Sequence, residues 1–245
     1  MPKKLTKAEN FNWYERIPKE YLTKTHNPHY NIHHIQLPFR AVIVGNSGSM
    51  KTNTLLNIIF NMPDTFSRIV ICTKNKDEPF YNYLEEHLPG VEIYEGIEAL
   101  PDLDSFNKEE NSLVVCDDLV LEKNQKGVEQ YAIRCRKLGA SLIYITQDYY
   151  KVPKTIRYNS TYLFIKKLAS LRDLQRILNE FSLGIDKKVF NDMYKHCTQK
   201  PNDFLLVDIQ PKEEELKFRK NFDECLLVKE WKYRRGLGRI QKSTF

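Results

Sequence analysis

The chain has 245 residues, of which 41% are hydrophobic, 12% aromatic and 29% charged. This is the composition of an ordinary globular protein, and a chain of this length can bury most of its apolar surface, which excludes disorder throughout. Lys and Arg outnumber Asp and Glu by 38 to 32, and much of this excess lies between residues 229 and 242.

The five cysteines form no C-x-x-C pair, and any disulfide scheme leaves one of them over. We therefore expect reduced thiols in a cytosolic compartment, and neither disulfides nor zinc. The N-terminus lacks the apolar core of a signal peptide, and no apolar run is long enough to cross a membrane. These features predict a protein that is neither secreted by the usual route nor membrane-spanning.

Residues 1–36 mix charged, aromatic and His residues without a sustained period, which predicts an N-terminal extension with one short helix. Four histidines lie between residues 26 and 34, namely His26, His29, His33 and His34. No cysteine cluster or carboxylate spacing supports a metal site there. We expect these histidines to pack at a surface or an interface.

Apolar runs and helical patterns alternate from residue 39 onward. The run at 39–45 ends in a glycine, and after a short loop Leu55, Leu56, Ile59 and Phe60 recur at helical spacing. Six further runs predict strands at 68–74, 91–96, 112–118, 140–147, 161–167 and 203–209. Helices are expected at about 77–88, 124–138, 170–181 and 186–197. The acidic run at 212–216 predicts the start of a C-terminal hairpin or helix.

Strands that are apolar throughout suit a sheet that is covered on both faces. Their alternation with helices predicts an α/β fold with a mostly parallel central sheet and helices on both faces. In such a sheet, ligands bind at the carboxyl ends of the strands. The residues that follow each strand are therefore the first place to look for a site.

The loop after the first strand has the sequence GNSGSMKT, made of Gly45, Asn46, Ser47, Gly48, Ser49, Met50, Lys51 and Thr52. It lies between a buried strand and a helix, where a phosphate-binding P-loop must lie. In that geometry, backbone N–H groups surround the phosphates, Lys51 reaches the β and γ oxygens, and the Thr52 hydroxyl ligates Mg²⁺. The loop therefore predicts ATP and Mg²⁺ as cofactors. One residue departs from the pattern, because Met50 stands where the P-loop has glycine.

Two carboxylates, Asp117 and Asp118, end the apolar strand at 112–118, about 65 residues after Lys51. A phosphoryl-transfer site needs one carboxylate near the metal and often a second one that orients the attacking water. Asp117 suits the metal and Asp118 suits the water. A pair of acids at a strand end also commonly caps the strand or the next helix. A catalytic site is favoured here because the acids follow a P-loop at the spacing typical of such sites.

The next strand ends at Gln147, whose side chain is suited to lie beside the γ-phosphate. Three arginines flank this strand, Arg134 and Arg136 before it and Arg157 after it. In ring ATPases an arginine from a neighbouring subunit neutralises charge in the transition state, which accelerates the reaction by about 10³ to 10⁵. Arginines on helix faces also form ordinary surface salt bridges, so the choice among the three stays open.

The segments GNSGSMKT, LVVCDD, RCRKLGASLIYITQD and VPKTIRYNS together resemble the packaging ATPases of poxviruses, other large DNA viruses and virophages, a branch of the FtsK–HerA group of P-loop ATPases. The resemblance covers roughly residues 38 to 210. It implies a RecA-like parallel sheet and a homo-oligomeric ring that acts on double-stranded DNA. It also implies capsid proteins as partners and a location in the host cytoplasm, at the viral factory, or in the virion.

The family's functional residues match this sequence position by position. Lys51 and Thr52 correspond to its phosphate loop, Asp117 to its magnesium ligand, Asp118 to water activation and Gln147 to sensing. Arg136 matches the arginine before the sensor strand, and Arg157 with Asn159 matches an Arg-x-Asn motif. Cellular relatives commonly have Glu where Asp118 stands, so a shorter side chain must serve here. Met50 is the second departure, and it bears on the turnover rate.

These observations divide the chain into an N-terminal extension (1–36), a P-loop ATPase domain (37–210) and a C-terminal extension with a basic tail (211–245). We expect an active DNA-translocating ATPase. The alternatives are a P-loop kinase of a nucleotide or small molecule, disfavoured because no arginine-rich lid is present, and a nucleotide-binding module that has lost catalysis. The tail from Lys229 is either a solvated tail or a DNA contact whose affinity would fall with salt.

Overall fold

The computed structural model describes residues 11–18, 26–181 and 183–231. The basic tail, which the sequence predicts to be either a solvated tail or a DNA contact, lies outside the described residues from residue 232 on. No helix among the described residues has the length and apolar character needed to cross a lipid bilayer.

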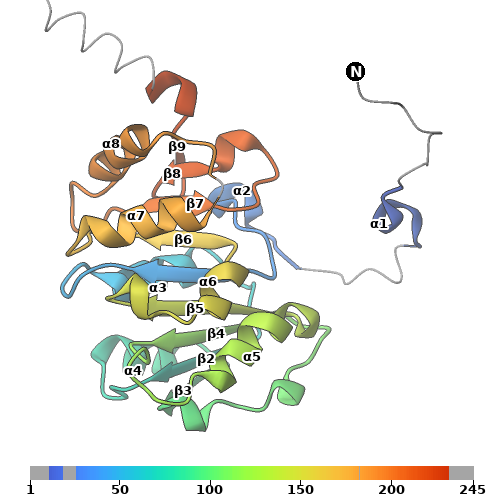
Figure 1. Ribbon diagram of the computed structural model, residues 1–245. Helices are drawn as coiled ribbons and strands as arrows, with labels where there is room; N and C mark the ends of the chain where they lie inside the picture. Colours follow the sequence, from blue (N-terminus) through green and yellow to red (C-terminus); the bar gives the residue numbers. More distant parts are fainter. Residues whose placement is uncertain (1–10, 19–25, 182, 232–245) are drawn as a thin grey trace, which may run out of the picture.

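One sheet of nine strands forms the centre of the described residues, in the order β3-β2-β4-β5-β1-β6-β7-β8-β9 (Figure 1). The first six strands pair in parallel, whereas β7, β8 and β9 pair antiparallel with their neighbours. The strand bounds are β1 Arg40–Val44, β2 Arg68–Thr73, β3 Val91–Glu95, β4 Ser112–Asp117, β5 Ala140–Thr146, β6 Tyr162–Ile165, β7 Leu205–Asp208, β8 Phe218–Lys220 and β9 Glu224–Cys225. The predicted mostly parallel sheet is confirmed, with a strand in each of the seven predicted places.

Helices cover both faces of this sheet. Because side chains alternate along a strand, Val42 and Val44 pack with the helices of one face, and Ala41 and Ile43 with those of the other. The first face holds α5 Lys126–Arg134, α6 Lys154–Asn159, α7 Leu171–Glu180 and α8 Lys187–Cys197, and the second holds α3 Lys51–Phe60 and α4 Pro79–His87. Figure 1 shows α5, α6 and α7 in front of the sheet. Double coverage is why the strands are apolar throughout.

Two further helices, α1 Trp13–Arg16 and α2 Tyr30–His33, lie in the N-terminal extension, where the sequence predicts one. Short 3-10 turns occupy several connections, namely η2 Ile97–Ala99, η3 Leu103–Ser105, η4 Cys135–Leu138, η5 Tyr149–Lys151 and η6 Glu214–Leu216. The helix expected at 124–138 ends as η4, which Gly139 terminates in the left-handed region at φ 68°. The sequence gives no sign of α6, because six residues are too few to establish a helical period.

The C-terminal segment after residue 210 forms η6 and then the β8–β9 hairpin, the first of the two predicted alternatives. The Arg219 side chain of β8 is fully buried and donates hydrogen bonds to the backbone carbonyls of His33 (2.8 Å) and Phe222 (3.1 Å). The hairpin therefore belongs to the same sheet as β1 and is tied to α2. The division of the chain at residues 36 and 210 stays a prediction.

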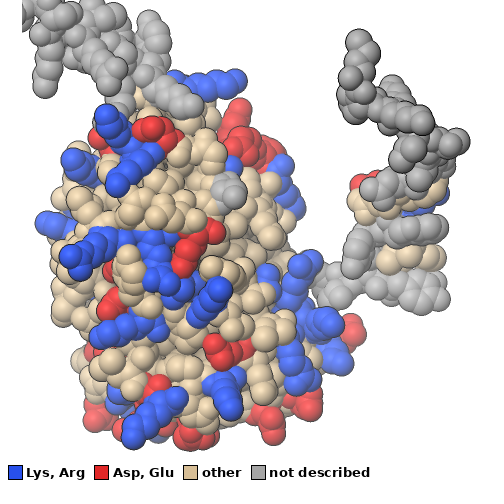
Figure 2. Space-filling model, in the orientation of Figure 1, with Lys and Arg blue, Asp and Glu red and all other residues tan. Residues whose placement is uncertain are grey.

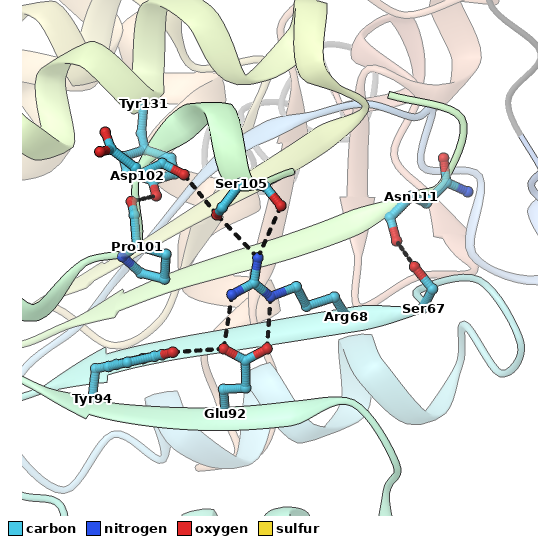
Figure 3. Close-up of polar contacts among 9 residues, drawn as sticks. All are labelled: Ser67, Arg68, Glu92, Tyr94, Pro101, Asp102, Ser105, Asn111 and Tyr131. Atoms are coloured by element: carbon cyan, nitrogen blue, oxygen red, sulfur yellow. Dashed lines mark hydrogen bonds and ion pairs between the residues drawn. The ribbon is translucent and has the colours of Figure 1, made fainter. Parts of the chain in front are cut away.

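A network of polar contacts holds the segment between β3 and β4 against the sheet (Figure 3). Arg68, at the start of β2, makes two hydrogen bonds to the Glu92 carboxylate (2.7 and 2.8 Å) and a third to the Ser105 hydroxyl (3.2 Å). The Tyr131 hydroxyl of α5 donates to the Pro101 carbonyl. These contacts fix residues 97–111 beside β2 and α5, at the end of the sheet that β3 forms.

Candidate functional site

The GNSGSMKT loop leaves β1 at the carboxyl edge of the sheet, between β5 and β6. The backbone N–H of Gly45 donates to the carbonyl of Thr146 (3.3 Å), and that of Asn46 donates to the carbonyl of Lys167 (2.9 Å). A Cβ atom on Gly45 would lie 2.4 Å from the Ser49 hydroxyl oxygen and 2.6 Å from the Lys166 Cβ. Only glycine fits there, so the first residue of the motif is fixed by close packing.

Met50 caps the N-terminus of α3 in the left-handed region, at φ 62° and ψ 44°. A glycine takes this conformation without steric cost, whereas any other residue at this position lowers the stability of the fold by about 1 to 2 kcal/mol. The Met50 side chain is 43% exposed, so it does not fill the inside of the loop. Gly48 also has a positive φ of 72°, with open space around it. The departure from the motif therefore strains the backbone and does not crowd the loop.

Lys51 is the first residue of α3, and its ammonium donates to the carbonyl of Asn46 across the loop (3.0 Å). Burial lowers the pKa of Lys51, while the nearby charges of Asp117 and Asp118 raise it. The strand end with two acids therefore lies close enough to the P-loop lysine to affect its charge.

Tyr81, on α4, joins the two residues that the sequence assigns to the metal. Its hydroxyl donates to an Asp117 carboxylate oxygen at 2.6 Å. Burial raises the pKa of Tyr81, and the nearby Thr52 side chain opposes this shift. Burial is the main cause of a raised pKa at Asp117, and the Tyr81 hydrogen bond and the Lys51 charge oppose it. A hydroxyl and a carboxylate oxygen thus converge from α3 and β4.

Oxygen atoms of this kind are the ligands that Mg²⁺ prefers. In the part of the chain that the structure describes, no three or more His, Cys, Asp or Glu residues gather to hold a metal ion. A Mg²⁺ ion that accompanies a nucleotide needs only one or two protein ligands, because phosphates and water complete its shell. Thr52 and Asp117 fit that requirement.

Asp118 and Gln147 follow neighbouring strands, β4 and β5, at this same edge. Asp117 is paired with Ile145, and the Asp118 N–H donates to the Ile145 carbonyl (3.2 Å). Asp118 has a positive φ of 53°, and both its side chain and that of Gln147 are exposed. Strained backbone of this kind persists where the surroundings hold it, often at functional sites. The structure thus brings both residues to the edge that carries Lys51.

Neither Arg136 nor Arg157 is brought to the loop of its own chain. Arg136 lies in η4, before β5, and so at the opposite, amino edge of the sheet, where it lines a pocket of about 160 Å³ with Arg40 and Asp208. Arg157 is only 4% exposed and makes two 3.0 Å contacts with the Glu180 carboxylate. It also donates to the Val152 carbonyl.

Asn159 of the Arg-x-Asn motif and the third candidate arginine, Arg134, also form contacts within the chain. The Asn159 amide donates to the Thr155 carbonyl (2.8 Å) within α6. Arg134 forms an exposed ion pair with Asp104 (3.8 Å). Of Arg134, Arg136 and Arg157, only Arg136 is both exposed and outside the ion pairs of the described residues.

Sequence reasoning missed two residues of this site. Tyr81 gives no signal, because an aromatic residue on an amphipathic helix is usually a core residue. Lys166, at the end of β6, is fully buried and donates to the carbonyl of Asn202 (3.0 Å). Burial lowers its pKa to about 8; Lys51 also lowers it, and Asp203 raises it. A lysine directly after an apolar strand was the available signal for it.

One protein family matches the chain over most of its length. The family described as Poxvirus A32 protein matches residues 29–209. No curated protein sequence matches the chain significantly.

Solved structures of similar fold include two complexes of one viral NTPase and a bacterial ATPase. The genome packaging NTPase B204 from Sulfolobus turreted icosahedral virus 2, in complex with sulfate, has a TM-score of 0.54 at 16% identity and covers 74% of this chain and 100% of that one. Its complex with AMPPCP gives 0.53 at 13% identity, over 76% and 98% of the two chains. EssC (ATPases 2 and 3) from Geobacillus thermodenitrificans gives 0.51 at 12% identity, over 84% and 44%. At these identities the likeness shows a shared fold and nothing further.

Proposed function

Since the chain belongs to the family of poxvirus A32 proteins, which matches residues 29–209, we propose that it is an ATPase that drives double-stranded DNA into a viral capsid. The observation that carries the proposal is the Tyr81 hydroxyl, which donates to Asp117 and lies near Thr52, between the P-loop helix and the acidic strand end. A similar fold occurs in the packaging NTPase B204, whose solved complexes include sulfate and AMPPCP.

Each residue of the site has a task in this proposal. The N–H groups of the loop and the Lys51 ammonium hold the β- and γ-phosphates of ATP, and Thr52 with Asp117 holds Mg²⁺. Mg²⁺, when bound, neutralises the charge that develops on the phosphate oxygens. The exposed Asp118 carboxylate orients the attacking water, and Gln147 beside it contacts the γ-phosphate.

The arginines decide how many copies take part. Arg136 lies at the amino edge, whereas Lys51 lies at the carboxyl edge, so the phosphates that Arg136 neutralises belong to another copy. This favours a homo-oligomeric ring in which subunits complete one another's sites. The other proposed partners are double-stranded DNA and capsid proteins, and the site of action is the host cytoplasm, at the viral factory, or the virion.

The test is phosphate release by the purified full chain, measured with and without duplex DNA while light scattering gives the mass of the particle. We expect duplex DNA to stimulate hydrolysis, and we expect Lys51→Ala to abolish it. Lys167→Ala, which removes an exposed lysine beside the same loop, is the matched control. If an assembled ring released phosphate at the same rate with and without duplex DNA, the proposal would be overturned. A phosphorylated acceptor would indicate the kinase, and nucleotide binding without turnover would indicate the non-catalytic module.

A further inference from the structure

Charge is strongly segregated along this chain. Residues 77–110 contain eleven Asp and Glu and one Lys, whereas residues 123–176 contain twelve Lys and Arg and three Asp and Glu. The first segment forms α4, β3, η2 and η3 at the end of the sheet, and the second includes α5, α6 and α7 on one face. A net charge of +6 for the whole chain therefore conceals two surfaces of opposite sign.

The first surface, here named the acidic edge, consists of Phe80, Tyr83, Glu85, Glu86 and Glu95. Phe80 and Tyr83 are three residues apart on α4, each 49% exposed, and the Tyr83 ring stacks on His87 at 4.1 Å. The three glutamates are exposed, and none of them takes part in an ion pair of the described residues. Acidic residues often protect an outermost strand such as β3 from pairing. That explanation covers Glu95 but not two exposed aromatic rings on a helix.

The second surface, here named the basic face, lies on η5, α6 and the start of α7 and consists of Tyr150, Lys151, Lys154, Tyr158, Leu171 and Arg172. The aromatic and leucine side chains are about half exposed, at 47%, 55% and 57%. The Lys154 ammonium lies over the Tyr158 ring, 5.0 Å from its centre. Figure 2 shows Lys and Arg gathered over α7 and α6.

The acids near the basic face are turned inward. Asp173 is 8% exposed and accepts from the backbone N–H of Tyr149 (3.4 Å). The Glu180 carboxylate lies between Arg157 (3.0 Å) and Arg176 (2.7 Å). Because these carboxylates are used internally, the cations that face solvent are balanced only in part, by the contact of Lys151 with Asp148 (3.7 Å).

Both surfaces therefore have large, exposed apolar side chains surrounded by charges of one sign. These charges are negative on the acidic edge and positive on the basic face. An apolar centre with a polar rim is the usual construction of a protein–protein interface. Duplex DNA would match the basic face but would be repelled by the acidic edge, whereas a second copy of the chain matches both. Contact between two different surfaces of one chain is heterologous and generates rings or filaments.

We propose that the acidic edge of one copy docks on the basic face of the next copy. This inference rests on the proposed ring ATPase and names the surfaces that build it. The basic face begins three residues after Gln147 in the sequence. The neighbouring subunit therefore rests on the segment that leads directly away from the proposed γ-phosphate contact.

Charge reversal tests this docking, with the full chain and a non-hydrolysable ATP analogue present. Lys154→Glu with Arg172→Glu reverses the basic face, and Glu85→Lys with Glu86→Lys reverses the acidic edge. We expect either double variant alone to raise the concentration needed for assembly by at least about 10-fold, because like charges then face each other. A 1:1 mixture of the two variants restores complementary charges at every contact between unlike copies, so the mixture should associate at concentrations where each variant alone does not.

Sedimentation at low and high salt measures the assembly, and wild-type assembly should weaken as salt screens the charges. Lys212 and Lys229 are exposed lysines outside both surfaces. Lys212→Glu with Lys229→Glu changes the net charge by the same amount as the basic-face variant and should assemble normally. Far-UV circular dichroism verifies that every variant is folded.

The possible failures are distinguishable. A wild-type protein that stays monomeric with ATP analogue and DNA would overturn the proposed ring itself. A wild-type protein that assembles, while the reversed variants assemble equally well or their mixture fails to recover, would overturn only the docking proposed here. Loss of duplex DNA binding with normal assembly in the basic-face variant would assign that face to nucleic acid and would likewise overturn the docking.

Discussion

Tyr81 is fully buried between the first turn of α3 and the carboxyl end of β4. Residues that hydrogen-bond to a metal ligand and fix its orientation commonly contribute 10- to 100-fold to metal affinity. We expect Tyr81→Phe, which removes only the hydroxyl, to raise the Mg²⁺ concentration for half-maximal ATP binding about 10-fold. Titration of a fluorescent ATP analogue with Mg²⁺ measures this. ATP affinity without Mg²⁺ should change little.

Tyr83→Phe is the matched control, because Tyr83 lies on the same helix but is 49% exposed. If the two variants needed the same Mg²⁺ concentration, Tyr81 would be a packing residue without influence on the metal ligands.

Met50 occupies a backbone conformation that glycine tolerates best. Met50→Gly relieves the strain but adds freedom to the unfolded chain, so we expect the free energy of unfolding to change by less than about 1 kcal/mol. Met50→Val places a β-branched residue at φ 62° and should lower it by about 1 to 2 kcal/mol, with weaker ATP binding. Chemical denaturation compares the two. Equal stability of the Gly and Val variants would contradict the strained geometry.

Lys166 predicts a pH dependence. Burial lowers its pKa from 10.5 to about 8. Between these values the unfolded chain keeps a proton that the native protein has lost, so the free energy of unfolding rises with pH; below about pH 8 the full destabilisation is present. Relative to Lys166→Met, the wild type should therefore gain about 2 to 3 kcal/mol between about pH 8 and pH 10.

Denaturation curves at each pH measure this gain, and Lys167→Met, at the neighbouring exposed position, should follow the wild type. Parallel pH profiles for the wild type and Lys166→Met would mean that the Lys166 ammonium is not desolvated.

The pairing of α6 with α7 depends on the buried contact of Arg157 with Glu180. Both oxygens of the carboxylate are used, by Nε and Nη2 of Arg157 at 3.0 Å. Breaking a buried ion pair commonly costs about 3 to 5 kcal/mol, and Arg176 keeps part of the Glu180 charge balanced, so we expect Arg157→Met to destabilise by about 3 kcal/mol. Arg134→Met, which removes an exposed pair, should cost less than about 1 kcal/mol.

Chemical denaturation gives both values. If Arg157→Met kept its stability but assembled rings of it no longer hydrolysed ATP, the resemblance-based role of Arg157 in catalysis would be supported instead.

Elements with a strong apolar period could be predicted from the sequence, and those fixed by packing could not. The strands buried on both faces, such as β1 and β4, have continuous apolar runs, and the helices α7 and α8 begin at clear caps, Ser170 and Asp186. By contrast, α6 is too short to show a period. The sequence also treats Arg136 and Arg157 alike, and only tertiary structure separates an exposed arginine from a buried one.

For the site itself, the motif and the strand end identify Lys51, Thr52 and Asp117, because their chemistry is tied to local sequence. Tyr81 and Lys166 reach the site from α4 and β6 through pairing and packing that no local pattern reports. Residue roles that depend on distant partners are thus the part that sequence reasoning missed.

On the scale of the molecule, the sheet joins a parallel part to an antiparallel flank made of β7, β8 and β9. A chain that ends at residue 210 would lose β8, with the buried Phe218 and Arg219, and would leave β7 as an open edge. We expect its melting temperature to fall by more than about 10 °C, since several kcal/mol of packing and hydrogen bonding are lost. A chain that ends at residue 231 is the control and should melt near the wild type.

Thermal unfolding followed by circular dichroism measures both chains. Equal melting temperatures would show that the fold does not need the residues after 210, as the predicted division at that position has it.

The two backbone hydrogen bonds that tie Gly45 to β5 and Asn46 to the end of β6 clamp the start of the phosphate loop from both sides. That point cannot slide along the sheet unless one of these bonds breaks. We therefore expect any displacement that accompanies nucleotide turnover to arise beyond this point, in the segments that continue from Gln147 and Lys167.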